Sequence, residues 1–259
     1  MSRNIKHFYG VKLHASDGEI GHVKDFYFDD QKWVIRYAVV DTGSWLLGRR
    51  VLIAPHAFGN ADQNRALLLV NLTRQQIKDS PPIESHKPVS RQYEEEYYRY
   101  YGLPSYWTGE GLWGPNAFPI VSQPPSAFPI VSPHPSPFQS EAAEESGNAL
   151  DVKDPHLRST HAVTGYHLQT REETIGHVTD FIMDDKSWAI CHVVFEAGTW
   201  FSGKEIVISP SHVDRIHYAD SAVYVNLTKE AILQAPEFQV ATLGATNPDR
   251  QNLAGQDSQ

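Results

Sequence analysis

The sequence predicts a mainly β protein: two small β-barrels, each ending in a short helix, joined by a long linker rich in proline and tyrosine. Three observations lead to this prediction. A segment recurs without a gap 155 residues further along the chain, it alternates β-branched and aromatic stretches with turn residues, and the region between the copies is dense in proline. A chain of 259 residues is long enough for one large domain or two small ones.

The recurring segment covers residues 10–81 and 165–236. Within it, residues 20–26 (IGHVKDF) reappear as residues 175–181 (IGHVTDF). About a third of the paired positions are identical and the register does not slip, which indicates repetition of one structural unit. We interpret the chain as a tandem duplication.

Each copy is expected to begin with a β-hairpin. In copy one, residues 20–28 and 33–40 are rich in β-branched and aromatic residues, and Asp29-Asp30 between them favours a turn. Neither face of the second strand in copy two is polar throughout, which suits a small barrel or closed sheet. Shorter strands are expected at residues 51–54, 67–70, 206–209 and 222–225.

A short helix is expected at the end of each copy. Thr73 and Thr228 are placed to accept the first unpaired amides of these helices. A proline follows each helix and closes it off. The two helices and their prolines are residues 74–79 with Pro81, and residues 229–235 with Pro236.

The composition divides the chain into four parts. Residues 1–82 form repeat 1 and residues 156–240 form repeat 2. Residues 83–155 form an acidic, aromatic linker that holds most of the prolines, and proline at this density favours extended or disordered chain. Residues 241–259 are polar and are expected to form a disordered tail.

Residues 17–26 (DGEIGHVKDF), the Asp29-Asp30 turn and residues 50–55 (RVLIAP) resemble the PRC-barrel domain. This family includes the cytoplasmic part of the photosynthetic reaction-centre H subunit and the C-terminal half of the ribosome-maturation factor RimM. Copy two departs from the pattern at residues 172–174, where EET replaces DGE. The resemblance implies a small β-barrel that docks onto larger assemblies.

The sequence predicts no enzyme and no cofactor. The chain has no nucleophile elbow, no P-loop and no dinucleotide fingerprint. Cys191 is the single cysteine, so an internal disulfide and a cysteine-based zinc site are excluded. It lies within an apolar strand, where a packed residue is favoured over a nucleophile.

Two matched polar pairs recur, and they are considered for metal binding. His22 precedes Asp25 by three residues, and His177 precedes Asp180 by the same spacing. A carboxylate can orient an imidazole for metal or base chemistry. Two candidate ligands per copy are too few for a closed site, so we expect no metal centre and favour a surface role on a strand.

Aromatic residues are the candidates for partner docking. Trp45 and Trp200 lie at matched positions between two glycines, where each is either an exposed anchor or a plug over the barrel end. Tyr97, Tyr101 and Trp107 lie in an aromatic stretch of the linker. Its first half can form a helix, which would place Tyr93, Tyr97, Tyr100 and Tyr101 along one face. We favour a docking strip there, and the alternative is a brace that folds back onto a barrel.

Charge is distributed unevenly. Residues 1–82 carry a net charge of +3, whereas residues 83–155 and residues 156–259 each carry −6. Sequence-independent nucleic-acid binding needs a concentrated basic face, so a nucleic-acid partner is not expected. The mildly basic copy one packing on the acidic copy two, or a homodimer, would add stability to two small barrels.

We therefore expect a cytoplasmic docking or adaptor protein that binds a larger assembly through two similar barrels. No apolar run approaches the roughly 20 residues that span a bilayer, so any membrane contact is expected to be indirect. The first alternative is a peripheral component of a membrane electron-transfer complex, similar to the H subunit. The second is a ribosome or RNA-particle assembly factor, similar to RimM.

Overall fold

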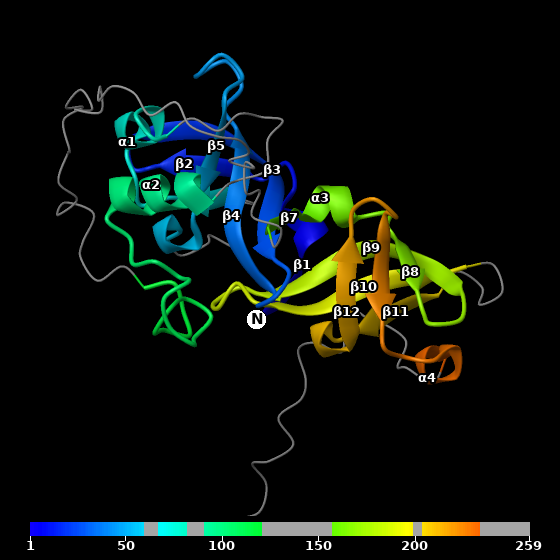
Figure 1. The fold of residues 1–259 in the computed structure, drawn as a ribbon. Helices are drawn as coiled ribbons and strands as arrows, with labels where there is room; N and C mark the ends of the chain where they lie inside the picture. Colours follow the sequence, from blue (N-terminus) through cyan, green and yellow to red (C-terminus); the bar gives the residue numbers. More distant parts are fainter. Residues whose placement is uncertain (60–66, 82–90, 121–156, 199–203, 234–259) are drawn as a thin grey trace, which may run out of the picture. The chain divides into compact units, whose positions relative to one another are not determined.

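The computed structural model describes residues 1–59, 67–81, 91–120, 157–198 and 204–233. These residues form two compact units, each with its own sheet (Figure 1). We call them the N-unit, residues 5–163 with 186–189, and the C-unit, residues 1–4, 164–185 and 190–259. Both are mainly β, as the sequence predicts.

Among the described residues, the N-unit sheet has six strands in the order β5-β4-β3-β2-β6, with β7 also paired to β3. The β2–β6 pair is parallel and the other pairs are antiparallel. The predicted hairpin is the β3–β4 pair, in which Phe26 faces Ala38. The strands are β2 (Lys12–Ala15), β3 (Gly18–Asp29), β4 (Val34–Asp41), β5 (Arg50–Ile53), β6 (Leu67–Leu69) and β7 (Leu157–Ser159).

Three α-helices accompany this sheet in the described part of the N-unit: α1 (Arg74–Lys78), α2 (Arg91–Tyr101) and α3 (Thr160–Val163). The predicted cap of α1 is present, because the Thr73 hydroxyl accepts from the Gln76 amide and the Gln76 side chain accepts from the Thr73 amide. The chain also forms short 3-10 turns at Ile5–Phe8 and Pro55–Ala57.

The C-unit sheet has seven strands among the described residues, in the order β11-β10-β9-β8-β13-β12, with β1 also paired to β9. Its β8–β13 pair is parallel, like β2–β6 in the N-unit. The elements are β1 (Ser2–Asn4), β8 (His167–Gln169), β9 (Thr174–Asp184), β10 (Ile190–Ala197), β11 (Glu205–Ile208), β12 (Val213–His217), β13 (Ala222–Val225) and α4 (Lys229–Leu233).

Neither strand path closes into a barrel within the described ranges. The edges are β5 and β6 in the N-unit and β11 and β12 in the C-unit. The sheets nevertheless enclose cores of the predicted residue types. The fully buried rings include Phe26 and Phe28 in the N-unit and Phe181 and Phe195 in the C-unit.

Gly21 and its counterpart Gly176 mark the closest backbone approach in the two hairpins. A Cβ at Gly21, which has φ +143°, would collide with the carbonyl of Asp41. A Cβ at Gly176 would collide with the carbonyl of Glu196 in the same way. Both positions therefore require glycine for the two strands to pair.

Each unit contains a strand that the sequence assigns to the other repeat. Strand β1 belongs to the C-unit, where Ser2 pairs with Asp184, and strand β7 belongs to the N-unit, where Leu157 pairs with Asp29. Leu157 is the counterpart of Ser2, and Asp184 is the counterpart of Asp29, because each lies 155 residues further along the chain. The two repeats thus exchange their first strands in the same register.

The turn before β10 also belongs to the unit of the other repeat, although its counterpart in repeat 1 stays in the N-unit. Residues 186–189 belong to the N-unit, where the Ile35 amide donates to the Trp188 carbonyl at 2.9 Å. The Trp188 ring stacks on Phe58 with centroids 4.9 Å apart. The unit boundaries therefore differ from the boundaries at residues 82 and 156 that composition suggests.

Part of the region that composition assigns to the linker lies in the N-unit. Residues 91–120 are part of the N-unit and begin with helix α2, whereas residues 121–156 lie outside the described ranges, as does the tail. None of the helices in the described part of the chain is long and apolar enough to cross a membrane.

Candidate functional site

The loop between β4 and β5 is the most prominent candidate for contact with a partner. We call residues 43–48 the Trp45 loop, which extends away from the sheet at the top of Figure 1. Backbone bonds hold its conformation: the Gly48 amide donates to the Gly43 carbonyl at 2.6 Å, and the Arg49 amide donates to the Leu46 carbonyl at 3.0 Å. The Thr42 hydroxyl closes the base by donating to the Arg49 carbonyl at 2.7 Å.

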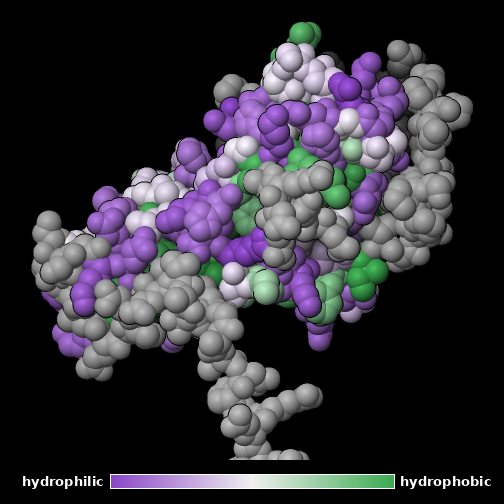
Figure 2. Space-filling view, turned by 180° about the vertical axis from the view of Figure 1, so that it is seen from behind, coloured by the Kyte–Doolittle hydropathy of each residue, from purple (hydrophilic) through white to green (hydrophobic). Residues whose placement is uncertain are grey.

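Leu47 lies in this loop with 96% of its surface exposed. Its φ of +54° lies in the left-handed region, where a leucine is disfavoured by about 1 kcal/mol or more. The chain thus holds an apolar side chain in water in a strained conformation. Figure 2 shows an apolar group at the upper end, where Figure 1 places this loop.

Trp45 is half-buried. Its exposure is therefore intermediate between that expected of an exposed anchor and that expected of a plug. The guanidinium of Arg74, at the start of α1, lies 4.5 Å from the centre of its ring. The Arg74 amide in turn donates to the Asp17 carboxylate at 2.7 Å. The ring is therefore supported from one side. Trp200, the matched residue, lies outside the described residues.

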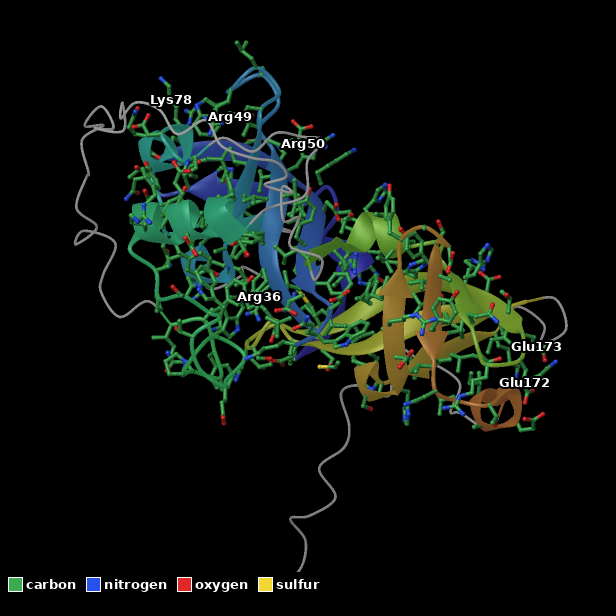
Figure 3. The ribbon with its side chains drawn as sticks, in the orientation of Figure 1. Arg36, Arg49, Arg50, Lys78, Glu172 and Glu173 are labelled. Carbon is green, nitrogen blue, oxygen red and sulfur yellow. The ribbon has the colours of Figure 1, made fainter. Side chains whose placement is uncertain are left out.

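Cationic side chains flank the Trp45 loop, as the labels in Figure 3 show. Arg49 donates to the carbonyls of Lys78 and Ser80 at 2.8 and 2.7 Å, and these acceptors carry no charge. Arg50 is exposed, and it lies opposite Asp41 in the β4–β5 ladder. None of Arg49, Arg50 and Lys78 forms an ion pair within the described ranges.

The aromatic stretch of the linker folds back onto the N-unit, as in the alternative arrangement. We call residues 91–113 the brace. Tyr97 and Tyr101 of α2 are only 1% and 3% exposed. The Tyr97 hydroxyl accepts from the Ala54 amide at 2.9 Å and donates to the Leu52 carbonyl at 3.2 Å. Burial raises the pKa of both phenols, so they stay neutral. These two tyrosines are therefore not on a docking surface, contrary to the interpretation favoured from the sequence.

Trp107 belongs to the same brace. Its half-buried ring packs edge-on against Tyr98 and Tyr106, with centroids 5.3 and 5.0 Å away. Tyr106 donates to the Glu94 carboxylate at 2.6 Å, and Tyr37 of β4 donates to the same oxygen at 2.8 Å. The brace is thus joined to the sheet through a buried acid that the sequence does not single out.

Arg36 anchors the end of the brace. The side chain is fully buried, with its guanidinium 3.7 Å from the centre of the Tyr106 ring and 5.0 Å from that of Trp113. It donates to Asp29 at 3.1 Å and to the Leu112 carbonyl at 2.6 Å. The only signal in the sequence is the alignment of Arg36 with Cys191, which places a charge on one copy alone.

His56 is a buried histidine beside this network. Its ring meets Trp113 edge-on at 4.9 Å and Tyr98 at 6.1 Å. Burial, aided by the charge of Arg36, lowers its pKa from 6.5 to about 4. His56 is therefore neutral at physiological pH, with no described hydrogen-bond partner for Nδ1.

This pKa predicts an acid-sensitive N-unit. Unfolded His56 takes up a proton near pH 6.5, but folded His56 does so only near pH 4. The unfolded state therefore binds more protons between these values, and stability falls as the pH is lowered through this window. The free energy of unfolding, measured in urea, should be about 2 kcal/mol lower at pH 5 than at pH 7. The His56→Phe variant should not show this difference. An equal loss in the variant would assign the effect to other groups.

The matched histidines and aspartates do not act as pairs. Asp25 accepts from the Ser159 hydroxyl at 2.6 Å, and Asp180 accepts from the Asn4 amide group at 2.8 Å. His177 is exposed and lies 3.8 Å from Glu196. His22 is half-buried and lies opposite Asp41 in the β3–β4 ladder. The two aspartates therefore hold the exchanged strands.

The described residues contain no group of three or more histidine, cysteine, aspartate or glutamate side chains that could hold a metal ion. Cys191 is half-buried, and burial raises the pKa of its thiol, which disfavours the reactive thiolate. No protein-family model and no curated protein matches the chain.

Proposed function

We propose that the chain is a non-enzymatic, cytoplasmic docking protein that contacts a larger assembly through the Trp45 loop. The observation that carries this proposal is the exposure of Leu47 on a loop that internal hydrogen bonds hold in place. An ordered loop loses little conformational entropy on binding, so apolar burial translates into affinity. Trp45 beside it supplies the residue type most enriched in binding hot spots.

The tandem repeat supports the same proposal. The sequence GTWFSG at residues 198–203 matches GSWLLG at residues 43–48. Two similar contact loops in one chain would bind an assembly with higher avidity than either alone. We further propose that both units are of the PRC-barrel type, on the strength of residues 17–26 and 50–55.

Substitution at Leu47 tests this proposal. Leu47→Asp should leave the thermal melt nearly unchanged, because the side chain has almost no internal contacts. The same change should reduce capture of the partner about tenfold or more, since a charge replaces a buried anchor. The measurement is quantitative pull-down from membrane and soluble fractions of the host, with mass spectrometry.

A matched control separates this effect from a general effect of added charge. Tyr218→Asp changes another exposed side chain, which is 75% accessible and lies in the C-unit. It should capture the same proteins as the unmodified chain. Equal capture by Leu47→Asp and the unmodified chain would reject the Trp45 loop as the contact.

A second candidate is attachment to an anionic membrane surface. Leu47 with Arg49, Arg50 and Lys78 combines an apolar side chain with flanking cations, and each cation near such a surface contributes about 1 kcal/mol. The acidic residues Asp41 and Asp79 on the neighbouring elements oppose this attraction. Sedimentation with vesicles of phosphatidylcholine, with and without phosphatidylserine, tests it. Binding that needs both phosphatidylserine and Leu47 would favour the membrane.

A further inference from the structure

The edge of β9 holds strand β1 through contacts to side chains as well as backbone. Arg3 pairs with Met183 in the ladder, and its Nε lies 3.2 Å from Oδ2 of Asp185. Asn4 donates from Nδ2 to Oδ2 of Asp180 at 2.8 Å. Asn4 and Asp180 are 5% and 2% exposed, so this bond is shielded from water. We call this edge the C-slot.

The edge of β3 holds strand β7 through the same chemistry. Arg158 pairs with Phe28, and its Nε donates to Oδ2 of Asp30 at 2.7 Å. Ser159 donates from its hydroxyl to Oδ2 of Asp25 at 2.6 Å. We call this edge the N-slot.

The two slots share a pair of aspartate contacts. They differ in their further contacts: the Met1 ammonium also bonds to Asp185 in the C-slot, and the Thr160 hydroxyl also bonds to Asp25 in the N-slot. Each uses one aspartate for the Nε of an arginine and a second aspartate for the small polar residue that follows it. In each slot the second aspartate also accepts from the next backbone amide, at Phe26 and Phe181. The C-slot therefore holds a short extended segment with arginine followed by asparagine, and the N-slot holds one with arginine followed by serine.

We propose that the two slots are binding sites for such a strand in trans, and that the partner they fit is a second copy of this chain. Both of its own donor strands, Ser2–Asn4 and Leu157–Ser159, carry the required residues. Strand addition to a sheet edge of this kind takes its affinity from main-chain bonds and its specificity from side chains. The proposal is independent of the Trp45 loop.

The length of the strands makes exchange between copies feasible. Only three residues pair in each slot, so few backbone bonds break when a strand leaves. The strand of the same chain competes at an effective concentration in the millimolar range, so the single chain prevails in dilute solution. Exchange between copies then becomes significant when concentrated protein refolds, which is the usual route to domain-swapped dimers.

A peptide of residues 1–8 (MSRNIKHF) provides the first test. The acceptor is the full chain with Arg3→Glu and Asn4→Leu, which disables its own strand and leaves the C-slot residues intact. A fluorescent peptide should bind this variant. Affinity should fall at least about tenfold when Asp180→Ala is added to the acceptor, or when the peptide carries Arg3→Glu, because each change removes a charge-assisted contact.

Equal binding of the peptide and its Arg3→Glu form, or no binding by an acceptor with a native circular-dichroism spectrum, would overturn the proposal.

Refolding the unmodified chain provides the second test. Donor-labelled and acceptor-labelled copies refolded together at high concentration should form dimers that show energy transfer. Failure of the unmodified chain to exchange would overturn the proposal.

Discussion

Cutting the chain within residues 121–156 should leave the two fragments in one particle. The first fragment carries β1, which belongs to the C-unit, and the second carries β7 and residues 186–189, which belong to the N-unit. Each unit therefore needs both fragments. A protease site inserted in this segment and cleaved under native conditions should give two bands on a denaturing gel and a single peak in size-exclusion chromatography.

The aspartates that hold the exchanged strands provide the control. The cut chain with Asp25→Ala and Asp180→Ala loses the side-chain contacts to Ser159 and Asn4. Buried Asn4 left unpaired costs about 1–3 kcal/mol. Its fragments should separate at lower urea concentrations than those of the cut, unsubstituted chain. Prompt separation of the unsubstituted fragments in buffer would contradict the prediction that the exchanged strands hold the two fragments together.

Arg36→Ala should be strongly destabilising. The change leaves Asp29 buried without its cation and removes the guanidinium that stacks against Tyr106 and Trp113. Removing one partner of a buried ion pair costs about 3–5 kcal/mol. The free energy of unfolding, measured in urea, should fall by this amount.

Two further variants locate the cause. Arg36→Met with Asp29→Asn should recover part of the loss, because it removes the stranded charge and keeps much of the volume. Arg215→Ala removes an exposed arginine that pairs with Asp214 and lies 4.0 Å from the Tyr224 ring, so its cost should stay near 1 kcal/mol or below. A loss under 1 kcal/mol for Arg36→Ala would contradict the role of the brace.

Local patterns predicted the central elements of each unit. The stretch from residue 20 to residue 40 was expected to form a hairpin, and β3 and β4 form it. Thr73 was expected to cap a helix, and it does so with Gln76. These features depend on nearby residues, so alternation and capping patterns detect them.

The exchange of strands could not be predicted in this way. The segment Ser2–Asn4 is three residues long and contains no β-branched or aromatic side chain, so nothing in it indicates a strand. Its pairing depends on β9, and the Asn4 and Asp180 side chains that bond are 176 residues apart in the sequence. Asp180 holds Asn4 because of this pairing, whereas its spacing from His177 indicated only a surface role on a strand.

The brace was only partly predictable. The spacing of Tyr93, Tyr97, Tyr100 and Tyr101 predicted a helix with an aromatic face, and α2 covers these residues. Which surface that face covers depends on partners elsewhere in the fold, because the Tyr97 hydroxyl bonds to the backbone of Ala54 and Leu52. Buried Arg36 of β4 holds the chain that follows, through the Leu112 carbonyl. A single charged residue in a strand carries no such information by itself.

Site-specific photo-crosslinking at position 47 tests the docking proposal most directly. A benzoylphenylalanine placed at Leu47 should give a discrete crosslinked product in host extract, and excess unmodified chain should compete it away while excess Leu47→Asp chain should not. The same group at Tyr218, which is also exposed, should give no such product. Identical products from both positions, or equal competition by both chains, would contradict the proposal that the Trp45 loop is the contact surface.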